Sequence, residues 1–338
     1  MTGRRPKPVA LPPLAADISG EYAACLWLKP LRSDNAHGIA ASWTSALSPV
    51  ASPSHARLAL IALLVGGIAI GGSPIFVRFS EVGPMATAFW RVALALVPFF
   101  IVSRALPQAD ERPSGLRDRL FLFLPGIFLA ADLGSWHLSL HMTSVANATL
   151  FANVAPVFVT LGSWLLFRTT ITPVFLAGLA LALIGVVVLK GGPAALGGGQ
   201  MAGDATAVVA AMFYAGYMLS IGHLRARFST SRIMVWTTFA AMTCMLPVAF
   251  FLEADLAPAT LFGWGMLLGL ALISHVGGQG LVTYALAYLP TAFSSLTLLL
   301  QPVVAALLAW LLLGEPVGLM QAIGGAIVLF GILVARRG

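Results

Sequence analysis

PTAFSSLTLLLQPVVAALLAWLLLGEPVGLMQAIGGAIVLFGILVAR is the sequence of residues 290–336. Residues 144–189 read SVANATLFANVAPVFVTLGSWLLFRTTITPVFLAGLALALIGVVVL, and the two stretches align without a gap at an offset of 146 residues. The less common residues that coincide at this offset are Pro156 with Pro302, Trp164 with Trp310, Gly178 with Gly324, and Gly185 with Gly331. Such matches are hard to obtain by chance, so the sequence predicts an internal duplication.

Each copy consists of two apolar runs joined by a short turn. In the second copy the runs are Phe293–Leu313 and Val317–Val334. A helix rises ~1.5 Å per residue, so ~20 residues cross a ~30 Å hydrocarbon core. Over the whole chain 59% of residues are hydrophobic and only 9% are charged, against roughly 25% in a soluble domain. The sequence therefore predicts an all-α integral membrane protein.

Ten apolar segments follow a polar tail at residues 1–56. The tail has no continuous apolar run, so no secretory signal is expected there; we expect it to be disordered and cytoplasmic, unless it stems from a start codon assigned too far upstream. The predicted transmembrane segments are residues 58–77, 84–103, 120–141, 144–167, 172–189, 204–224, 232–252, 263–286, 290–313 and 317–335.

The distribution of basic residues predicts the orientation of these segments. If the tail is cytoplasmic, then of the 19 Lys and Arg residues only Arg78 and Lys190 fall outside and Arg91 within a helix, as the positive-inside rule requires. Both termini are then cytoplasmic. Five helices per copy insert the second copy upside down, so the prediction is two inverted repeats, at residues 58–189 and 204–336, joined by a Gly-rich linker at 190–203. Inverted repeats of this kind support alternating access.

Other functional classes find little support in the composition. The net charge of +7 comes from basic residues scattered between apolar runs, so we expect no nucleic-acid partner. The two cysteines, Cys25 and Cys244, form no metal-binding or disulfide pattern. His137 and His141 stand four residues apart without a third ligand in register. No Walker-type sequence is present, and we expect no cofactor.

Two charged residues are predicted to lie within the membrane, where an ionisable group is costly and marks a functional hypothesis. Arg91 lies ~10 Å from the outer end of the second segment and Asp132 ~18 Å from the inner end of the third, so their depths nearly coincide. At the repeat offset both charges are absent, because Thr237 and Gly278 replace them. One interpretation is a structural ion pair. The other is that Arg91 meets an anionic group of a substrate, while Asp132 accepts a proton or an amine.

Further polar and aromatic residues are candidates for a substrate cavity. Asp132 shares a helical face with Trp136, and Asn153 lies on a polar stripe beside Pro156. Each proline frees a backbone carbonyl that then needs a partner, and Pro302 stands beside a second stripe. Packing between helices is the competing interpretation for all of these residues. The remaining candidates are Tyr214, Tyr217, His275, Gln279 and Gln301, of which His275 is a candidate proton relay.

The chain resembles the drug/metabolite transporter superfamily, in particular its EamA type. The resemblance covers about residues 58–336, and Thr169 departs from it where the second copy has Glu315. It implies ten helices in two five-helix repeats, cytoplasmic termini and secondary transport of small metabolites, often export. The motifs that carry it are Gly71-Gly72-Ser73-Pro74, Phe89-Trp90-Arg91, Pro156, Gln301-Pro302 and Leu313-Gly314-Glu315.

We therefore predict a secondary transporter, not an enzyme, in the inner (plasma) membrane, as a monomer or homodimer. It would move a small metabolite such as an amino acid by alternating access, with proton coupling or exchange as its driving force. Two alternatives differ in class. One is a membrane receptor or regulator without transport, and the other is an intramembrane enzyme. The enzyme lacks support because Asp132, Ser135 and His137 cannot converge from one helical turn.

Overall fold

The computed structural model describes residues 53–106, 113–143, 145–192, 201–314 and 317–338. All regular secondary structure in these residues is helical and none is a strand, which confirms the all-α prediction. Most of the predicted tail at 1–56 and of the linker at 190–203 lies outside the described residues, as do Glu315 and Pro316.

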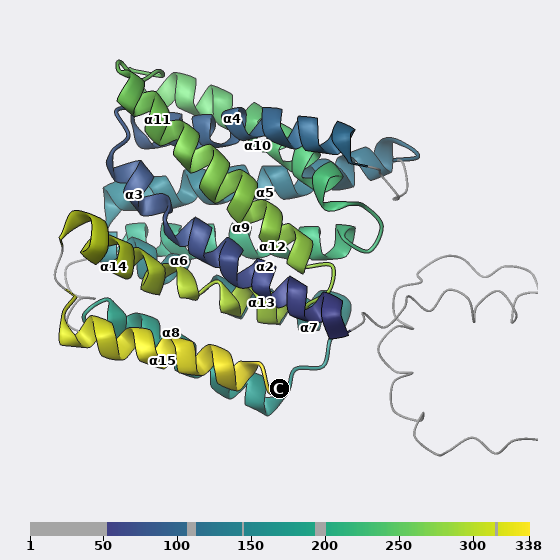
Figure 1. Cartoon of the computed structure of the whole chain (residues 1–338), viewed down its shortest axis with the longest axis vertical. Helices are drawn as coiled ribbons and strands as arrows, with labels where there is room; N and C mark the ends of the chain where they lie inside the picture. Colours follow the sequence, from purple (N-terminus) through teal and green to yellow (C-terminus); the bar gives the residue numbers. More distant parts are fainter. Residues whose placement is uncertain (1–52, 107–112, 144, 193–200, 315–316) are drawn as a thin grey trace, which may run out of the picture.

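The helices lie side by side and run back and forth between the two ends of the molecule (Figure 1). Several predicted segments are divided into two or three helices in the structure. In chain order the helices are α2 (Pro53–Gly71), α3 (Ser73–Arg78), α4 (Pro84–Ala105), α5 (Leu116–Met142), α6 (Val145–Ala152), α7 (Ala155–Phe167), α8 (Pro173–Leu189), α9 (Met201–Leu224), α10 (Thr230–Leu252), α11 (Leu261–Gly269), η3 (Leu270–Gln279), α12 (Gly280–Ala285), α13 (Thr291–Thr297), α14 (Leu300–Leu313) and α15 (Leu319–Ala335).

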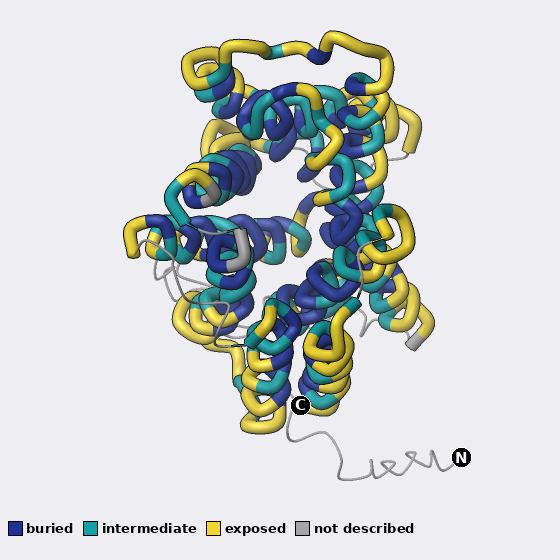
Figure 2. The backbone as a smooth tube through the Cα atoms, turned by 90° about the vertical axis from the view of Figure 1, so that its left-hand side faces the viewer, coloured by how far each residue is buried: buried dark blue, intermediate teal, exposed yellow. Residues whose placement is uncertain are grey.

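The outer surface of the helix assembly suits a hydrocarbon environment. Within the described residues, eight helical segments are long and apolar enough to cross a membrane, and only 33–44% of each apolar window is buried inside the protein. Figure 2 shows the exposed residues at the periphery and the buried ones facing inward. The outward apolar side chains therefore meet lipid, and the chain is a multi-pass membrane protein. The helices α8 and α15 are apolar but shorter, so the ten-helix count stays a prediction.

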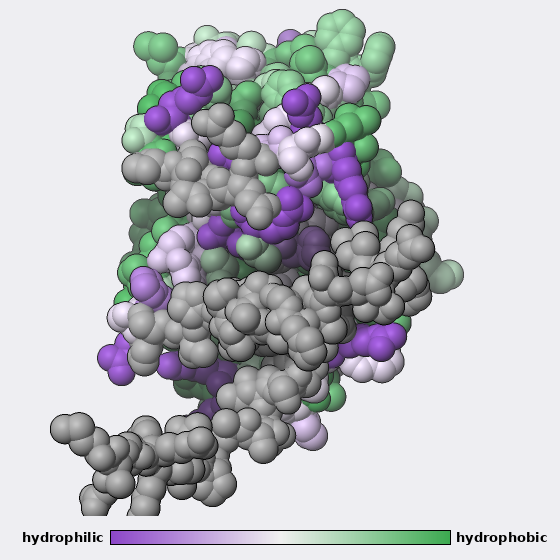
Figure 3. All heavy atoms as spheres, turned by 90° about the vertical axis from the view of Figure 1, so that its right-hand side faces the viewer, coloured by the Kyte–Doolittle hydropathy of each residue, from purple (hydrophilic) through white to green (hydrophobic). Residues whose placement is uncertain are grey.

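One end of the assembly carries both ends of the described chain and many basic residues. Helix α2 begins and helix α15 ends at the same end, on the right of Figure 1. Hydrophilic side chains gather on the uncovered part of that end in Figure 3. The basic residues of the loops and helix ends there include Arg104, Arg117, Arg119, Arg168, Arg225, Arg227, Arg336 and Arg337. This is the end that the sequence predicts to be cytoplasmic.

Two of the predicted segments are broken close to their prolines. Residues 153–154 separate α6 from α7, and residues 298–299 separate α13 from α14. Each break is followed within three residues by Pro156 or Pro302, whose missing N–H interrupts the helical ladder. The two breaks are 145 residues apart, one residue short of the 146-residue offset between the repeats. The prolines predict a freed backbone carbonyl in each segment, but they do not by themselves predict that each segment is divided into two helices.

The segment that was predicted as one helix at 263–286 contains a ten-residue π-helix, η3. It packs against α2, where Gly66 and Gly278 allow the two backbones to approach closely. Ser274 Oγ on η3 also donates to the Ala69 carbonyl on α2 at 3.0 Å. A π-helix of this length departs from ordinary helix geometry, and π-turns are frequent at functional sites. Nothing in the apolar periodicity had indicated it.

The four glycines that the repeat shares form the contact between α8 and α15. A Cβ added to Gly185 would lie 2.9 Å from the Gly324 carbonyl oxygen, and one added to Gly331 would lie 2.8 Å from the Gly178 carbonyl oxygen. Gly178 also abuts Ala335, and Gly324 abuts Leu189. The start of each helix thus meets the end of the other, so the two helices are antiparallel and pack backbone to backbone.

We expect Gly185→Ala to lower the thermal stability of the purified protein. The added methyl would lie 2.5 Å from the Val328 backbone nitrogen, and such overpacking costs about 1–3 kcal/mol. The matched control is Gly265→Ala on α11, where nothing lies within 4 Å of the added methyl. The measurement is the unfolding temperature of both variants in detergent. Equal unfolding temperatures would contradict the close packing of α8 on α15.

Candidate functional site

The two predicted intramembrane charges face a common interior region of the helix assembly. Arg91 lies on α4 and Asp132 on α5, and α10 packs against both helices. The two side chains are close enough for their charges to interact. No ion pair within 4.0 Å joins them, whereas Asp118 and Arg227 do form one elsewhere in the described part of the chain. The structure therefore brings the two charges together without a direct bond between them.

The second half of the chain contributes aromatic and amide side chains to the same region. The rings of Tyr214 and Tyr217 on α9 lie 5.7 Å apart, and both hydroxyl groups are within electrostatic reach of Arg91 and Asp132. Tyr217 Oη donates to Gln279 Oε1 at 3.1 Å, so that bond joins α9 to η3. Four helices from both halves thus meet at these residues.

Tyr214 occupies the centre of this group. Its hydroxyl group lies beside the side chains of Gln279 on η3 and Gln301 on α14. No described residue forms a hydrogen bond of acceptable geometry with it, and its oxygen is buried. Arg91, Asp132, Tyr214, Tyr217, Gln279 and Gln301 are called the central polar cluster below.

His275 borders the central polar cluster. Its Nε2 lies 3.2 Å from Thr238 Oγ1 on α10, and its ring is edge-on to Phe99 on α4, with 6.0 Å between ring centres. The histidine is close enough to Arg91 for their charges to interact. Nδ1 of the histidine is buried and has no hydrogen-bond partner among the described residues. This nitrogen is available to a proton, a water molecule or a ligand.

Two predicted site residues are less closely tied to the cluster. Trp136 lies one turn beyond Asp132 on α5, and its ring packs edge-on against His137 with 4.9 Å between ring centres. Asn153 lies at the break between α6 and α7, where Nδ2 donates to the Thr149 carbonyl oxygen at 2.7 Å. The structure gives Asn153 a local role in its own broken helix and shows no bond from it to the central polar cluster.

The polar stripes on the broken helices are mostly bonded within their own helix. Thr160 Oγ1 donates to the Pro156 carbonyl at 2.7 Å, and Thr297 Oγ1 donates to the Phe293 carbonyl at 2.9 Å. These hydroxyl groups are therefore unavailable as free donors. The exception is Ser294 Oγ on α13, which is buried and lacks a hydrogen-bond partner among the described residues.

Thr237 and Thr238 are not among the site residues predicted from the sequence. Both are buried on α10, and Thr237 stands at the repeat position of Arg91. Thr237 Oγ1 is another buried atom without a hydrogen-bond partner in the described part of the chain. A polar residue at the counterpart of a functional position in the other repeat was the signal that could have found Thr237. The role of Thr238 could not be predicted from the sequence, because its contact with His275 depends on how α10 packs against η3.

Several buried polar atoms in and around this region have no hydrogen-bond partner among the described residues. Every polar group away from water needs a partner, and an unsatisfied one costs several kcal/mol. The atoms concerned are on four helices from both halves of the chain. Water or a polar ligand is the partner that this arrangement can accept. The buried atoms are Arg91 Nε, Tyr214 Oη, Thr237 Oγ1 and His275 Nδ1.

Two tyrosines of the cluster offer a matched pair of variants. We expect Tyr217→Phe to destabilise the folded protein by about 1–3 kcal/mol, because the buried Gln279 amide would lose its donor. Tyr214→Phe removes a hydroxyl group that has no bond, so its unfolding temperature should stay equal to that of the parent or rise. Thermal unfolding in detergent measures both. An equal loss of stability in the two variants would contradict this hydrogen-bond assignment.

Comparison with protein families gives a match along most of the chain. The model of the EamA-like transporter family matches residues 57–190 and again residues 201–337. A solved crystal structure superposes with a TM-score of 0.69 at 18% sequence identity, covering 84% of this chain and 98% of the other. At that identity the superposition supports the fold alone.

Curated relatives include proteins that are named as transporters. An uncharacterized transporter of Archaeoglobus fulgidus is 27% identical over 82% of this chain and 95% of its own length. A probable terminal-alkyne amino-acid exporter of Streptantibioticus cattleyicolor is 28% identical over 72% of this chain and 83% of its own. The pseudopaline exporter of Pseudomonas aeruginosa is 24% identical over 74% of this chain and 84% of its own.

Proposed function

Because this chain belongs to the EamA-like transporter family, we propose that it is a secondary active exporter of a small amino-acid-like metabolite. The observation that carries the proposal is the central polar cluster, in which both halves of the chain place polar groups at membrane depth. Two of these groups, Arg91 and Tyr214, have a buried atom without a partner among the described residues. A transported ligand would supply the missing partners while it is bound, and water would supply them otherwise.

The charges of the cluster suit a zwitterionic substrate. Arg91 would bind the substrate carboxylate, and Asp132 would bind its amine or take up a proton. The absence of a contact ion pair between them supports this role, because both groups remain available to a third partner. Tyr214, Gln279 and Gln301 would hydrogen-bond the polar parts of the substrate. The relatives named as a probable terminal-alkyne amino-acid exporter and a pseudopaline exporter support this class of cargo and the outward direction.

Correspondences between the two halves support alternating access. The antiparallel contact of Gly178 with Gly331 becomes that of Gly324 with Gly185 when the copies are exchanged. Arg168 and Gly314, which are also 146 residues apart, both end their helices in the left-handed conformation, with φ of 53° and 67°. In addition, the first helix of each half packs on the third predicted segment of the other half, since α2 contacts η3 and α9 contacts α5. Such a pattern is expected of inverted repeats that rock about a central site.

The orientation of the proposed exporter follows from its charge. The end that carries most loop arginines would face the cytoplasm, with both chain termini, in an inner (plasma) membrane. Transport would use a gradient, through proton coupling or through exchange. In the proton-coupled case Asp132 and His275 are the groups that would carry the proton.

A binding screen with Arg91 variants tests the proposal. We expect an amino acid to raise the unfolding temperature of the full-length protein in detergent, when it is screened beside sugars, nucleobases and polyamines. A ligand at 100 times its Kd adds ~2.7 kcal/mol of stability. In Arg91→Ala the stability added by the same ligand concentration should fall to about 0.4–1.4 kcal/mol, because a hydrogen bond to a charged group contributes about 1.5–3 kcal/mol, or roughly 10- to 100-fold in Kd.

Arg104→Ala is the matched control for this screen. Arg104 lies in the last turn of the same helix, where its guanidinium covers the Phe100 ring at 4.9 Å, far from the cluster. This variant should retain the ligand shift. If a folded Arg91→Ala protein shows the same shift as the parent, Arg91 does not bind the ligand and is structural. If no amino acid shifts the parent protein or exchanges in counterflow from proteoliposomes, the proposed cargo is wrong.

A further inference from the structure

At the end of the molecule where α3 ends and α11 begins, a carboxylate of the first half binds the second half. Glu81 Oε2 accepts from the Thr260 backbone nitrogen at 3.0 Å, and Glu81 Oε1 accepts from the Thr260 hydroxyl group. These bonds hold the pKa of Glu81 below its ordinary value, so the side chain is anionic at neutral pH. Its position at the N-terminus of α11 also suits a negative charge.

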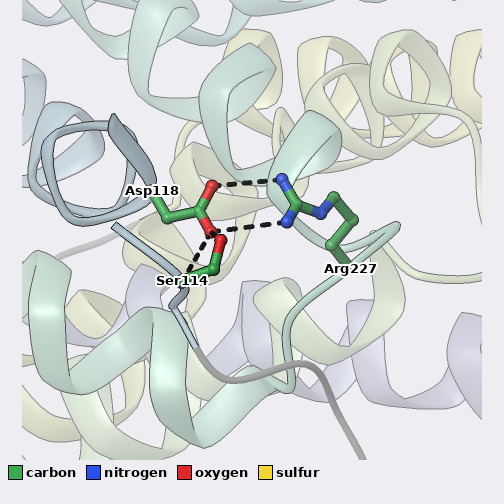
Figure 4. Close-up of polar contacts among 3 residues, drawn as sticks. All are labelled: Ser114, Asp118 and Arg227. Carbon is green, nitrogen blue, oxygen red and sulfur yellow. Dashed lines mark hydrogen bonds and ion pairs between the residues drawn. The ribbon is translucent and has the colours of Figure 1, made fainter. Parts of the chain in front are cut away.

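At the opposite end, an arginine of the second half binds the first half (Figure 4). Arg227, which follows α9, donates to Asp118 Oδ1 at 3.2 Å and to Oδ2 at 3.4 Å. Asp118 is in the first turn of α5, and its Oδ2 also accepts from the backbone nitrogen and the hydroxyl group of Ser114 at 2.9 Å each. This contact is an ion pair of which the arginine is 49% exposed and the aspartate 11%.

These two contacts occupy the same place in the two copies of the repeat. Adding 146 to residue 81 gives Arg227, and subtracting 146 from residue 260 gives Ser114. The contact of Glu81 with Thr260 and the contact of Arg227 with the Ser114–Asp118 turn therefore join equivalent positions of the two copies. In both, the residue after the first helix of one half reaches the start of the third helix of the other half. The duplication has kept the position of the contact while its chemistry has diverged.

A third set of bonds reinforces only the end that carries Glu81. Glu253 Oε1 accepts from the Met85 backbone nitrogen at 2.8 Å, so a carboxylate of the second half caps α4 of the first. Trp90 Nε1, next to Arg91, donates to the Leu256 carbonyl at 2.6 Å. In the described residues, this end is thus held by contacts in both directions between the halves.

We propose that the Glu81–Thr260 and Asp118–Arg227 contacts are the two latches of the transport cycle, each keeping its own end of the central polar cluster closed. This rests on the proposed function, because a rocking transporter must open one end while the other stays shut. Two equivalent contacts at opposite ends meet that requirement. Breaking one latch shifts the balance toward opening of its own end and leaves the other intact.

Distance measurements between spin labels at each end test the proposal. In a background in which Cys25 and Cys244 are replaced by serine, one label pair is placed at Arg78 and Ala259 and another at Arg119 and Ala226, all exposed positions. Arg227→Gln should lengthen the Arg119–Ala226 distances and leave the other pair unchanged or shorter. Glu81→Gln should do the reverse. Exposed pairs contribute modestly, so we expect about a two- to fivefold shift between short and long populations.

Three further variants keep the test decisive. Arg227→Lys retains the charge and should restore most of the short distances, which a purely steric role of Arg227 would not predict. Arg117→Gln removes a neighbouring charge from the turn of Asp118 and should change neither pair. Glu81→Asp replaces Glu81→Gln if the latter fails to fold, and should give a smaller shift in the same direction.

Together, the distance and counterflow measurements test the proposed latches separately from the proposed cargo. The distances are recorded without substrate, whereas counterflow of an amino acid is measured on the same variants in proteoliposomes. Distances that move in opposite directions, in a protein without counterflow, would support the latches and reject the proposed cargo. Counterflow in the parent protein, with distances that change at the same end in both variants or at neither, would overturn the latches.

Discussion

Hydrocarbon offers no hydrogen bonds, and this constraint organises the whole structure. It requires the backbone to be helical wherever it meets lipid, and the described residues contain no strand. It also makes every polar atom in the interior conspicuous. Most hydroxyl groups satisfy the constraint locally, as Thr160 does by donating to the Pro156 carbonyl. Some of the atoms that do not, such as Tyr214 Oη and His275 Nδ1, lie in or beside the central polar cluster, which is where a polar ligand would be stabilised.

The duplication shows how one pattern can serve two purposes. Where the copies agree, as at the four glycines between α8 and α15, the shared residues serve packing. Where they differ, the chemistry is concentrated in one copy. Gly278 allows η3 to approach Gly66 and Ile70 of α2, whereas its counterpart in the first copy is Asp132. A position used for close packing in one half is thus free to carry a charge in the other.

The hydrogen bonds of charged side chains between the halves lie near the ends of the helices in the described part of the chain. The contacts of Glu81 with Thr260 and of Asp118 with Arg227 join segments that are distant in sequence. The central polar cluster is held mainly through Tyr217 and Gln279, so the interior is joined by few direct bonds. A scaffold that is tied at its ends and sparsely bonded in its interior can change the access to that interior without losing its packing.

The membrane character, most helix positions, the duplication and the candidate polar residues could be predicted from the sequence alone. Hydropathy, proline and glycine act locally or at a fixed repeat, and so can be read along the chain. Only the tertiary structure decided which polar groups are partners. It left Arg91 and Asp132 near each other without a bond, bonded Asn153 to its own helix, and brought Thr238 to His275. It also revealed the π-helix η3 and the two end contacts. These depend on the rotation and spacing of neighbouring helices, which are set by the packing of side chains far apart in the sequence.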